Sequence, residues 1–158
     1  MEEQVDLTSV KGVKSEGVDL EKFHKTNAKI ESVEVIQVPS NYTPLIEGTE
    51  EHQKQWVLKV GSGVLESIGE GEKKIDFRAS ELFNLIQDEK GKLTGFPTGE
   101  KSNLGKFVRD LRIEIESVED LKQLIEVLVG KDATIKAYEK EVEIDGNKVS
   151  RTYLKYLY

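Results

Sequence analysis

The chain of 158 residues contains no cysteine and only two histidines, His24 and His52. The absence of cysteine excludes disulfides and thiolate metal sites. The histidines do not have the H-x-x-x-H or H-E-x-x-H spacing of metal ligands, so we expect no metal site. No apolar run approaches the roughly 20 residues that cross a bilayer, and the first 25 residues lack the apolar core of a signal peptide. We therefore expect a cytoplasmic protein with no membrane partner.

Catalytic patterns are scarce as well. Residues 99–102, GEKS, are similar to the end of a nucleotide-binding P-loop, but they lack its upstream glycine and its intact Gly-Lys pair. Because 34% of the chain is charged, carboxylate pairs arise by chance, and none can be assigned as acid and base. No Ser/His/Asp arrangement stands out. We therefore predict a protein that is not an enzyme, with no catalytic residues and no cofactor.

What the chain does contain is charge, distributed unevenly. Acidic residues outnumber basic ones, 30 to 23, for a net charge of -7, and the surplus of Glu and Lys is typical of a warm-growing host. A uniformly acidic surface repels phosphate. Residues 90–112 reverse this balance with six basic residues against two acidic ones. This local reversal is the main functional hint in the sequence.

The apolar patterns predict a flexible N-terminal extension over 1–27 and a single domain over 28–158. Within the extension, residues 19–24 could form one helical turn, with Leu20 and Phe23 packed on the domain. A phase slip between Val35 and Ile36 predicts a bulge or bend in the first strand. Strands are expected at 28–38, 56–60, 75–78, 131–144 and 149–158, the last two joined by a tight Asp-Gly turn, with helices at 80–87, 104–111 and 117–128.

Three strands, a helical insert over about 79–130 and two closing strands are the element order of the OB-fold. We predict a mainly β, OB-like fold: a five-stranded Greek-key barrel with two or three helices between strands 3 and 4. The alternative is a generic α+β domain in which helices cover one face of an antiparallel sheet.

A family resemblance lies in the same residues. The run SELFNLIQDEKGKLTGFPTGEKSNLGKFVRDLRI, followed by VGKDATIKAYEKEV and the closing RTYLKYLY, resembles the back half of small replication-associated proteins of bacteriophages and archaeal mobile elements. The resemblance covers 28–158. It implies an OB-type fold similar to that of single-stranded-DNA-binding proteins, and a role in replication or recombination.

We therefore predict a protein that binds single-stranded DNA with little sequence selectivity. In OB-folds the nucleic acid crosses strands 2 and 3, where cations hold phosphates and aromatic rings stack on bases. Trp56 and Phe77 alternate with apolar residues, a pattern that favours a position in the core, whereas Phe96 between Gly95 and Pro97 is the aromatic residue least explained by a periodic core. The predicted binding residues are Trp56, Lys59, Phe77, Arg78, Lys92, Phe96, Lys101, Lys106 and Arg109.

An alternative function belongs to a different class. The three closing tyrosines, Tyr153, Tyr156 and Tyr158, cannot all enter one small core, so at least one is expected to be exposed. They could line an exposed strand edge that binds a protein partner or a second copy of the chain. The protein would then be an acidic interaction or assembly module.

Overall fold

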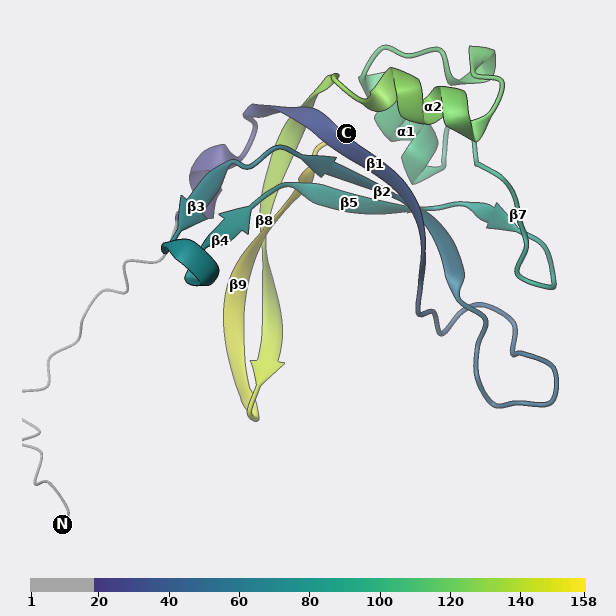
Figure 1. Ribbon diagram of the computed structural model, residues 1–158, viewed down its shortest axis with the longest axis horizontal. Coiled ribbons are helices and arrows are strands. Elements are labelled where there is room, and N and C mark those ends of the chain that lie inside the picture. The colour runs from purple at the N-terminus through teal and green to yellow at the C-terminus, as the bar shows by residue number, and fades with distance from the viewer. Residues whose placement is uncertain (1–18) are drawn as a thin grey trace, which may run out of the picture.

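The computed structural model describes residues 19–158 (Figure 1). Strands hold 44% and helices 19% of these residues, so the fold is mainly β, as predicted. None of the helices in this part of the chain is long and apolar enough to cross a membrane. With η for a 3-10 helix, the elements in chain order are η1 (Leu20–Phe23), β1 (Asn27–Val38), β2 (Gln55–Ser62), β3 (Glu66–Ile68), η2 (Gly71–Lys73), β4 (Ile75–Phe77), β5 (Ser80–Asn84), β6 (Ile86–Gln87), β7 (Leu93–Gly95), α1 (Asn103–Asp110), η3 (Ile115–Ser117), α2 (Leu121–Leu128), β8 (Asp132–Ile144) and β9 (Asn147–Tyr156).

Five strands form the main antiparallel sheet, in the order β5-β2-β1-β8-β9. The long first strand serves two halves of the sheet: Ala28 pairs with Ala133 of β8, whereas Ile30 and the residues after it pair with β2. The register shifts between Ile30 and Ser32, as in a β-bulge. The predicted bulge in the first strand is therefore present, but it lies before the phase slip at Val35 from which it was inferred.

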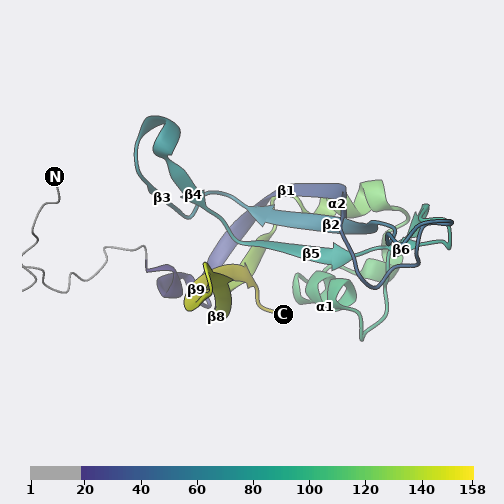
Figure 2. The same cartoon turned by 90° about the horizontal axis from the view of Figure 1, so that it is seen from below.

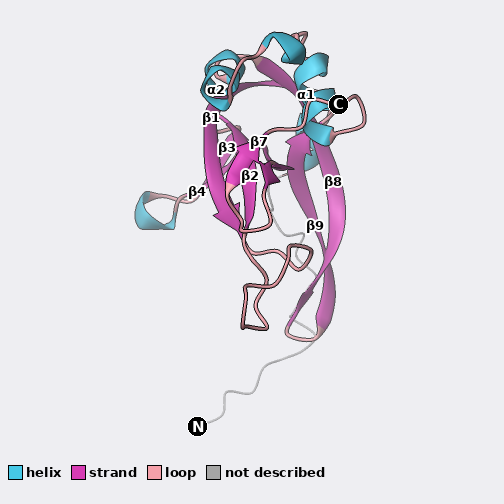
Figure 3. Cartoon of the chain, turned by 90° about the vertical axis from the view of Figure 1, so that its right-hand side faces the viewer, coloured by secondary structure: helices cyan, strands magenta, loops and turns pink. Residues whose placement is uncertain are grey.

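The outer strands of this sheet, β5 and β9, approach each other without forming a ladder. Glu81 of β5 bridges the gap: one carboxylate oxygen accepts the backbone N–H of Tyr156 at 3.4 Å, and the other accepts the hydroxyl of Tyr158. The strands curve into an arch (Figure 3). In the described part of the chain this sheet is not closed into a barrel by strand pairing.

The predicted helix over 80–87 is wrong, because these residues form β5 and β6. Phe83 and Leu85 are buried, whereas Leu82 and Ile86 are exposed, which is the alternation of a strand. The apolar run fits a helical period equally well. The ladder that β5 forms with β2, in which Phe83 lies opposite Leu58, decides between the two.

The predicted third strand, 75–78, forms β4 but lies outside the main sheet. It pairs with β3 in a separate hairpin, which projects from one end of the sheet (Figure 2). In the main sheet, β5 occupies the position beside β2 that was predicted for the strand at 75–78. A second small hairpin, formed by β6 and β7, precedes α1. The predicted insert therefore contributes strands as well as two α-helices.

The two α-helices are capped by side chains that precede them. Ser102 accepts the N–H of Gly105 at 3.0 Å and begins α1, which corresponds to the helix predicted at 104–111. Asp120 accepts the N–H of Gln123 at 2.8 Å and begins α2. The predicted start of this helix at Ser117 is wrong, because Ser117 ends the short 3-10 helix η3.

An aromatic cluster joins α1 to both outer strands of the sheet. The ring centroid of Phe107 lies 4.9 Å from that of Phe83 on β5 and 5.1 Å from that of Tyr156 on β9, and all three residues are buried. Tyr158 packs edge-on against Phe107. The helix thus covers the gap between β5 and β9, and its apolar face supplies the burial that strand pairing does not.

The predicted N-terminal extension, 1–27, lies only partly within the described residues; 1–18 lie outside them. The helical turn predicted at 19–24 is confirmed as η1, with Leu20 buried and Phe23 packed against the core. His24 accepts the backbone N–H of Ala137 through Nδ1 at 3.1 Å, and Lys25 donates its N–H to the carbonyl of Ile135 at 2.8 Å. Residues 19–26 therefore belong to the folded domain.

The bridging carboxylate makes stability depend on pH. Burial raises the pKa of Glu81 above its ordinary value of 4.5. A raised pKa in the folded state means that the protonated form favours folding and that this contribution is lost as pH rises through the folded pKa. We expect the free energy of unfolding of the native protein to fall, relative to that of Glu81→Gln, as pH rises from below 4.5 to neutrality. Urea unfolding across this range measures the difference. If the free energy of unfolding of the native protein instead rose relative to that of Glu81→Gln over this pH range, this role of Glu81 would be contradicted.

Candidate functional site

The β8–β9 hairpin projects from the body of the protein (Figure 1) and has one continuous register. A two-residue turn joins its strands, with positive φ at Asp145 (51°) and Gly146 (79°), as a type I′ turn requires. Ten opposing pairs run from Ile135 with Tyr156 at the base to Ile144 with Asn147 at the tip. Opposing residues in an antiparallel ladder point to the same face, so this register determines which side chains share a surface.

One face of the hairpin packs on the core and then becomes acidic. At the base it carries Ile135 opposite Tyr156, both buried. Toward the tip the same face carries three carboxylates, those of Glu139, Glu141 and Glu143. The acidic residues of the hairpin strands therefore cluster mainly on one side of the ribbon.

The opposite face carries no carboxylate between its base and its turn. Each opposing pair of residues forms one rung of this face. Counted from the base, the rungs are two cations, two aromatic rings, two cations and then two valines before the tip. We call the first three of these rungs the cationic face, which consists of Lys136, Tyr138, Lys140, Arg151, Tyr153 and Lys155.

This arrangement does not stabilise the hairpin. Lys136 lies directly opposite Lys155, and Lys140 directly opposite Arg151. Like charges in directly opposing positions destabilise a ladder. None of these four cations has a carboxylate within 4.0 Å among residues 19–158, where the ion pairs are Lys22–Glu66, Lys74–Asp76 and Arg109–Glu116. A bound anion would relieve the repulsion.

The two tyrosines form the middle rung of the cationic face. Their ring centroids are 5.8 Å apart, and the Nζ of Lys155 lies 5.0 Å from the ring centroid of Tyr138. Tyr153 is 37% exposed. Rungs on one face of a strand repeat about every 6.8 Å, so rings and cations follow one another along the ribbon. Alternating rings and cations can stack on bases and neutralise phosphates in turn.

Lys106 extends the cationic face beyond the hairpin. It lies on α1 and lines a cavity of about 250 Å³ together with Lys136 and Lys155 at the base of the hairpin. Of the nine binding residues predicted from the sequence, Lys106 shares a cavity with the cationic face.

The three predicted aromatic residues, Trp56, Phe77 and Phe96, have structural roles. All three are half-buried and pack against the hydrophobic core. Trp56 also donates a hydrogen bond from Nε1 to the carbonyl of Gly91 at 3.0 Å. The rings thus already have partners within the protein.

Four of the predicted cations are exposed and lie on separate segments. Lys59 on β2 is flanked in register by Glu34 and Leu82, so it faces a carboxylate neighbour. The other three lie in the connections before β5, β7 and α1: Arg78, Lys92 and Lys101.

Arg109 is held by internal contacts. Its Nη2 lies 2.5 Å from Oε1 of Glu116 and donates to the carbonyl of Thr98 at 2.6 Å. The hydrogen bond from Arg109 lowers the pKa of Glu116. These contacts link α1 to the segments that precede and follow it, so Arg109 helps to hold the helix in place.

The closing tyrosines lie partly in the core and partly at the surface. The prediction that at least one of them is exposed is therefore confirmed. Tyr156 is buried in the aromatic cluster, and the hydroxyl of Tyr158 is bound by Glu81. Tyr153 lies exposed on the cationic face. Tyr153 and Tyr158 are thus similarly exposed, and of the two only Tyr153 lies on the cationic face.

None of the six residues of the cationic face was predicted to bind nucleic acid, and only Tyr153 was predicted as a possible protein contact, although the sequence contains the signal for all of them. The Asp145-Gly146 turn implies a two-residue loop, and such a loop determines every opposing pair. Listing the pairs from the turn outward places all the cations of this face together. The five residues that were predicted for no contact are Lys136, Tyr138, Lys140, Arg151 and Lys155.

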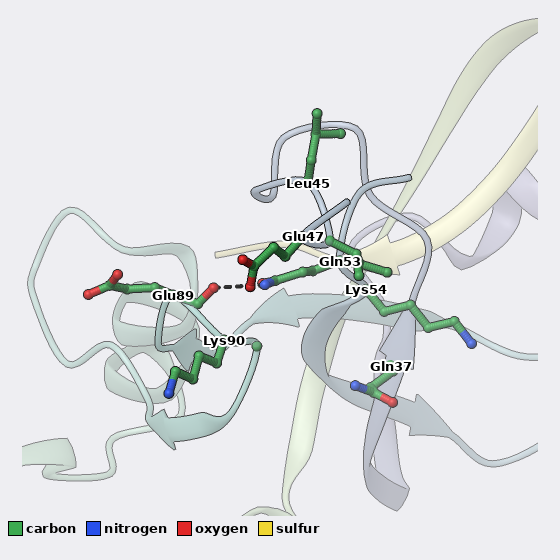
Figure 4. A pocket seen from close by; sticks show the side chains of 9 residues that line it. Gln37, Leu45, Glu47, Gln53, Lys54, Glu89 and Lys90 are labelled. Carbon is green, nitrogen blue, oxygen red and sulfur yellow. Dashed lines mark hydrogen bonds between the residues drawn. The ribbon is translucent and has the colours of Figure 1, made fainter. Parts of the chain in front are cut away.

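A larger cavity of about 490 Å³ lies between the loop 39–54 and the turn that joins β6 to β7 (Figure 4). Gln53 closes one side of it by donating from Nε2 to the carbonyl of Glu89 at 2.7 Å. The lining carries the carboxylate of Glu47 and the ammonium groups of Lys54 and Lys90. This mixture of charges favours no single class of ligand, so the cationic face is the stronger candidate site.

No protein-family model, curated protein or solved structure matches the chain. The inference of function therefore depends on the residues and their geometry.

Removing the repulsion should stabilise the hairpin. Lys140→Glu places a carboxylate opposite Arg151, and we expect the free energy of unfolding to rise by roughly 0.2–1 kcal/mol. The matched change Lys148→Glu lies on the other face, opposite Glu143, and should lower the free energy by a similar amount. Urea unfolding at low ionic strength measures both. Shifts of the same sign in the two variants would refute the assigned register.

Proposed function

We propose that the protein binds single-stranded nucleic acid along the cationic face of the β8–β9 hairpin. The observation that carries the proposal is the separation of charge on this ribbon: four cations and two tyrosines on one face, and three glutamates on the other. A surface selected only for folding would pair these charges across the ladder, because opposite charges in opposing positions stabilise it.

The acidic character of the rest of the protein restricts where a strand binds. With a net charge of -7, most of the surface repels a phosphate backbone. The glutamates behind the cationic face repel it as well, so the backbone is directed to one side of the ribbon. Binding is therefore local and moderate, and it depends strongly on salt.

The tyrosines favour a single strand over a duplex. Unpaired bases can turn toward Tyr138 and Tyr153 and stack on them, whereas the bases of a duplex are already stacked on one another. Stacking tolerates any base, so the binding is weakly sequence-selective. Each stacked base contributes about 1–3 kcal/mol.

We further propose that the fold is OB-like. The strand order β5-β2-β1-β8-β9, with β5 beside β9 across the Glu81 bridge, supports this proposal. The OB-fold is a partly open five-stranded barrel, and the loop between its last two strands contributes to oligonucleotide binding. The β8–β9 hairpin corresponds to that loop. A role in replication or recombination of a virus or mobile element is supported by the sequence resemblance.

The second candidate function is an acidic interaction or assembly module, which would bind another protein through exposed apolar and aromatic side chains of the hairpin. Val149 and Ile144 are exposed beside the turn, and Tyr153 is exposed farther along β9. Apolar contacts of this kind would bind a protein with little response to salt. Salt dependence therefore separates the two candidates.

Fluorescence anisotropy with a labelled single strand of roughly 20–30 bases tests the proposal, with a duplex of the same sequence as control. About four phosphate contacts predict that log K falls with log salt at a slope of about -3. Arg151→Glu should weaken binding and make the slope shallower, and Tyr138→Ala with Tyr153→Ala should weaken binding with little change in slope.

Lys148→Glu is the matched control, because it makes the same change of charge on the same strand but on the glutamate face. We expect this variant to retain far more affinity than Arg151→Glu. Equal losses in the two variants would exclude the cationic face as the binding surface. Absence of binding at low salt would refute the proposed function.

A further inference from the structure

The cavity at the base of the hairpin collects cations from three separate elements. Lys106 from α1, Lys136 from β8 and Lys155 from β9 line a space of about 250 Å³. The described residues provide no carboxylate within 4.0 Å of any of the three. Three lysines that line one cavity bring like charges close together, and an anion bound there would reduce their repulsion.

Glu81 is a carboxylate close enough to interact with two of these lysines, and its oxygens already accept hydrogen bonds. It interacts electrostatically with Lys136 and Lys155. However, one of its oxygens accepts the N–H of Tyr156 and the other accepts the hydroxyl of Tyr158. Glu81 therefore offsets part of the positive charge without forming an ion pair with the lysines, and the cavity keeps a net positive charge of about two.

The position of the cavity indicates which part of a strand would reach it. The cationic face runs from Lys140 and Arg151, next to the valine pair, to Lys136 and Lys155 at the base. There the cavity is bounded by Asn103 of α1 and by Leu157 and Tyr158. The edge-on packing of Tyr158 against Phe107 fixes this boundary. A strand that follows the face toward the base meets this boundary, which suits a chain end better than a continuing chain.

Charge and size together specify the group. A phosphodiester carries one negative charge, whereas a terminal phosphate carries about -1.5 to -2 at pH 7, which matches the net charge of the cavity. The volume is below the roughly 300–1,000 Å³ of pockets for drug-sized ligands, and it suits a phosphate with part of its sugar. Asn103, whose side-chain amide can donate hydrogen bonds, also lines the cavity.

We propose that this cavity binds a phosphomonoester at the end of a nucleic-acid strand, so that the protein prefers phosphorylated ends. The inference depends on the proposed function, because the cationic face is what leads the strand to the cavity. The shared chemistry is the terminal phosphate, carried on the 5′ or the 3′ end.

The test compares three oligonucleotides of one sequence by anisotropy, with a 5′-phosphate, a 3′-phosphate or hydroxyl ends. We expect one phosphorylated form to bind about tenfold more tightly than the hydroxyl form, the effect of about one charge-assisted hydrogen bond. In Lys106→Gln this ratio should fall to near one. Lys101→Gln lies before α1, outside the cavity lining, and should keep the ratio of the native protein.

The outcomes separate this inference from the proposed function. Binding of the hydroxyl form with a ratio near one overturns the cavity assignment and leaves the proposed function intact. Loss of the ratio in Lys101→Gln as well as Lys106→Gln also overturns it. If no oligonucleotide binds, the proposed function fails, and titration with inorganic phosphate decides on the cavity: a rise in Tm that Lys106→Gln abolishes supports it, and an equal response overturns it.

Discussion

The register of the β8–β9 hairpin is the constraint on which the rest of the structure depends. The two-residue turn, with positive φ at both Asp145 and Gly146, allows one alignment of the strands. This alignment directs Ile135 and Tyr156 into the core. A shift by one residue would turn those side chains outward and bring lysines to the core. Core burial therefore enforces the separation of cations from carboxylates, even though like charges oppose each other across the ladder.

The hairpin is anchored at its base and projects at its tip (Figure 1), and the cationic face extends from the base toward the tip. Tyr156 joins the base to Phe107 and so to α1, while Glu81 holds the adjoining edge of β5. The tip projects away from the body (Figure 1). The side chains that stabilise the fold and those proposed to bind a strand thus lie on opposite faces of one ribbon. Changes on the cationic face can alter binding with little cost to the core.

Local patterns in the sequence predicted the elements correctly where the spacing of apolar residues fitted only a helix or only a strand. Examples are α1 after Ser102 and the closing hairpin. They failed at 80–87, whose apolar run fits a helix and a strand equally, until pairing with β2 decides. A count of charge along the chain finds the basic residues of 90–112, whereas the cations of the cationic face converge across a ladder. The bridge from Glu81 to Tyr158 spans 77 residues, and no local pattern predicts it.

Ultraviolet cross-linking of the protein to a single-stranded oligonucleotide, followed by mass spectrometry of the linked peptides, tests the central claim most directly. The cationic face and the core-packed rings lie on different peptides, so the site of linkage distinguishes them. We expect cross-links at Tyr138 or Tyr153, whose rings stand between the cationic rungs. Linkage at Trp56, Phe77 or Phe96 instead, with the hairpin unmodified, would contradict the assignment of binding to the cationic face.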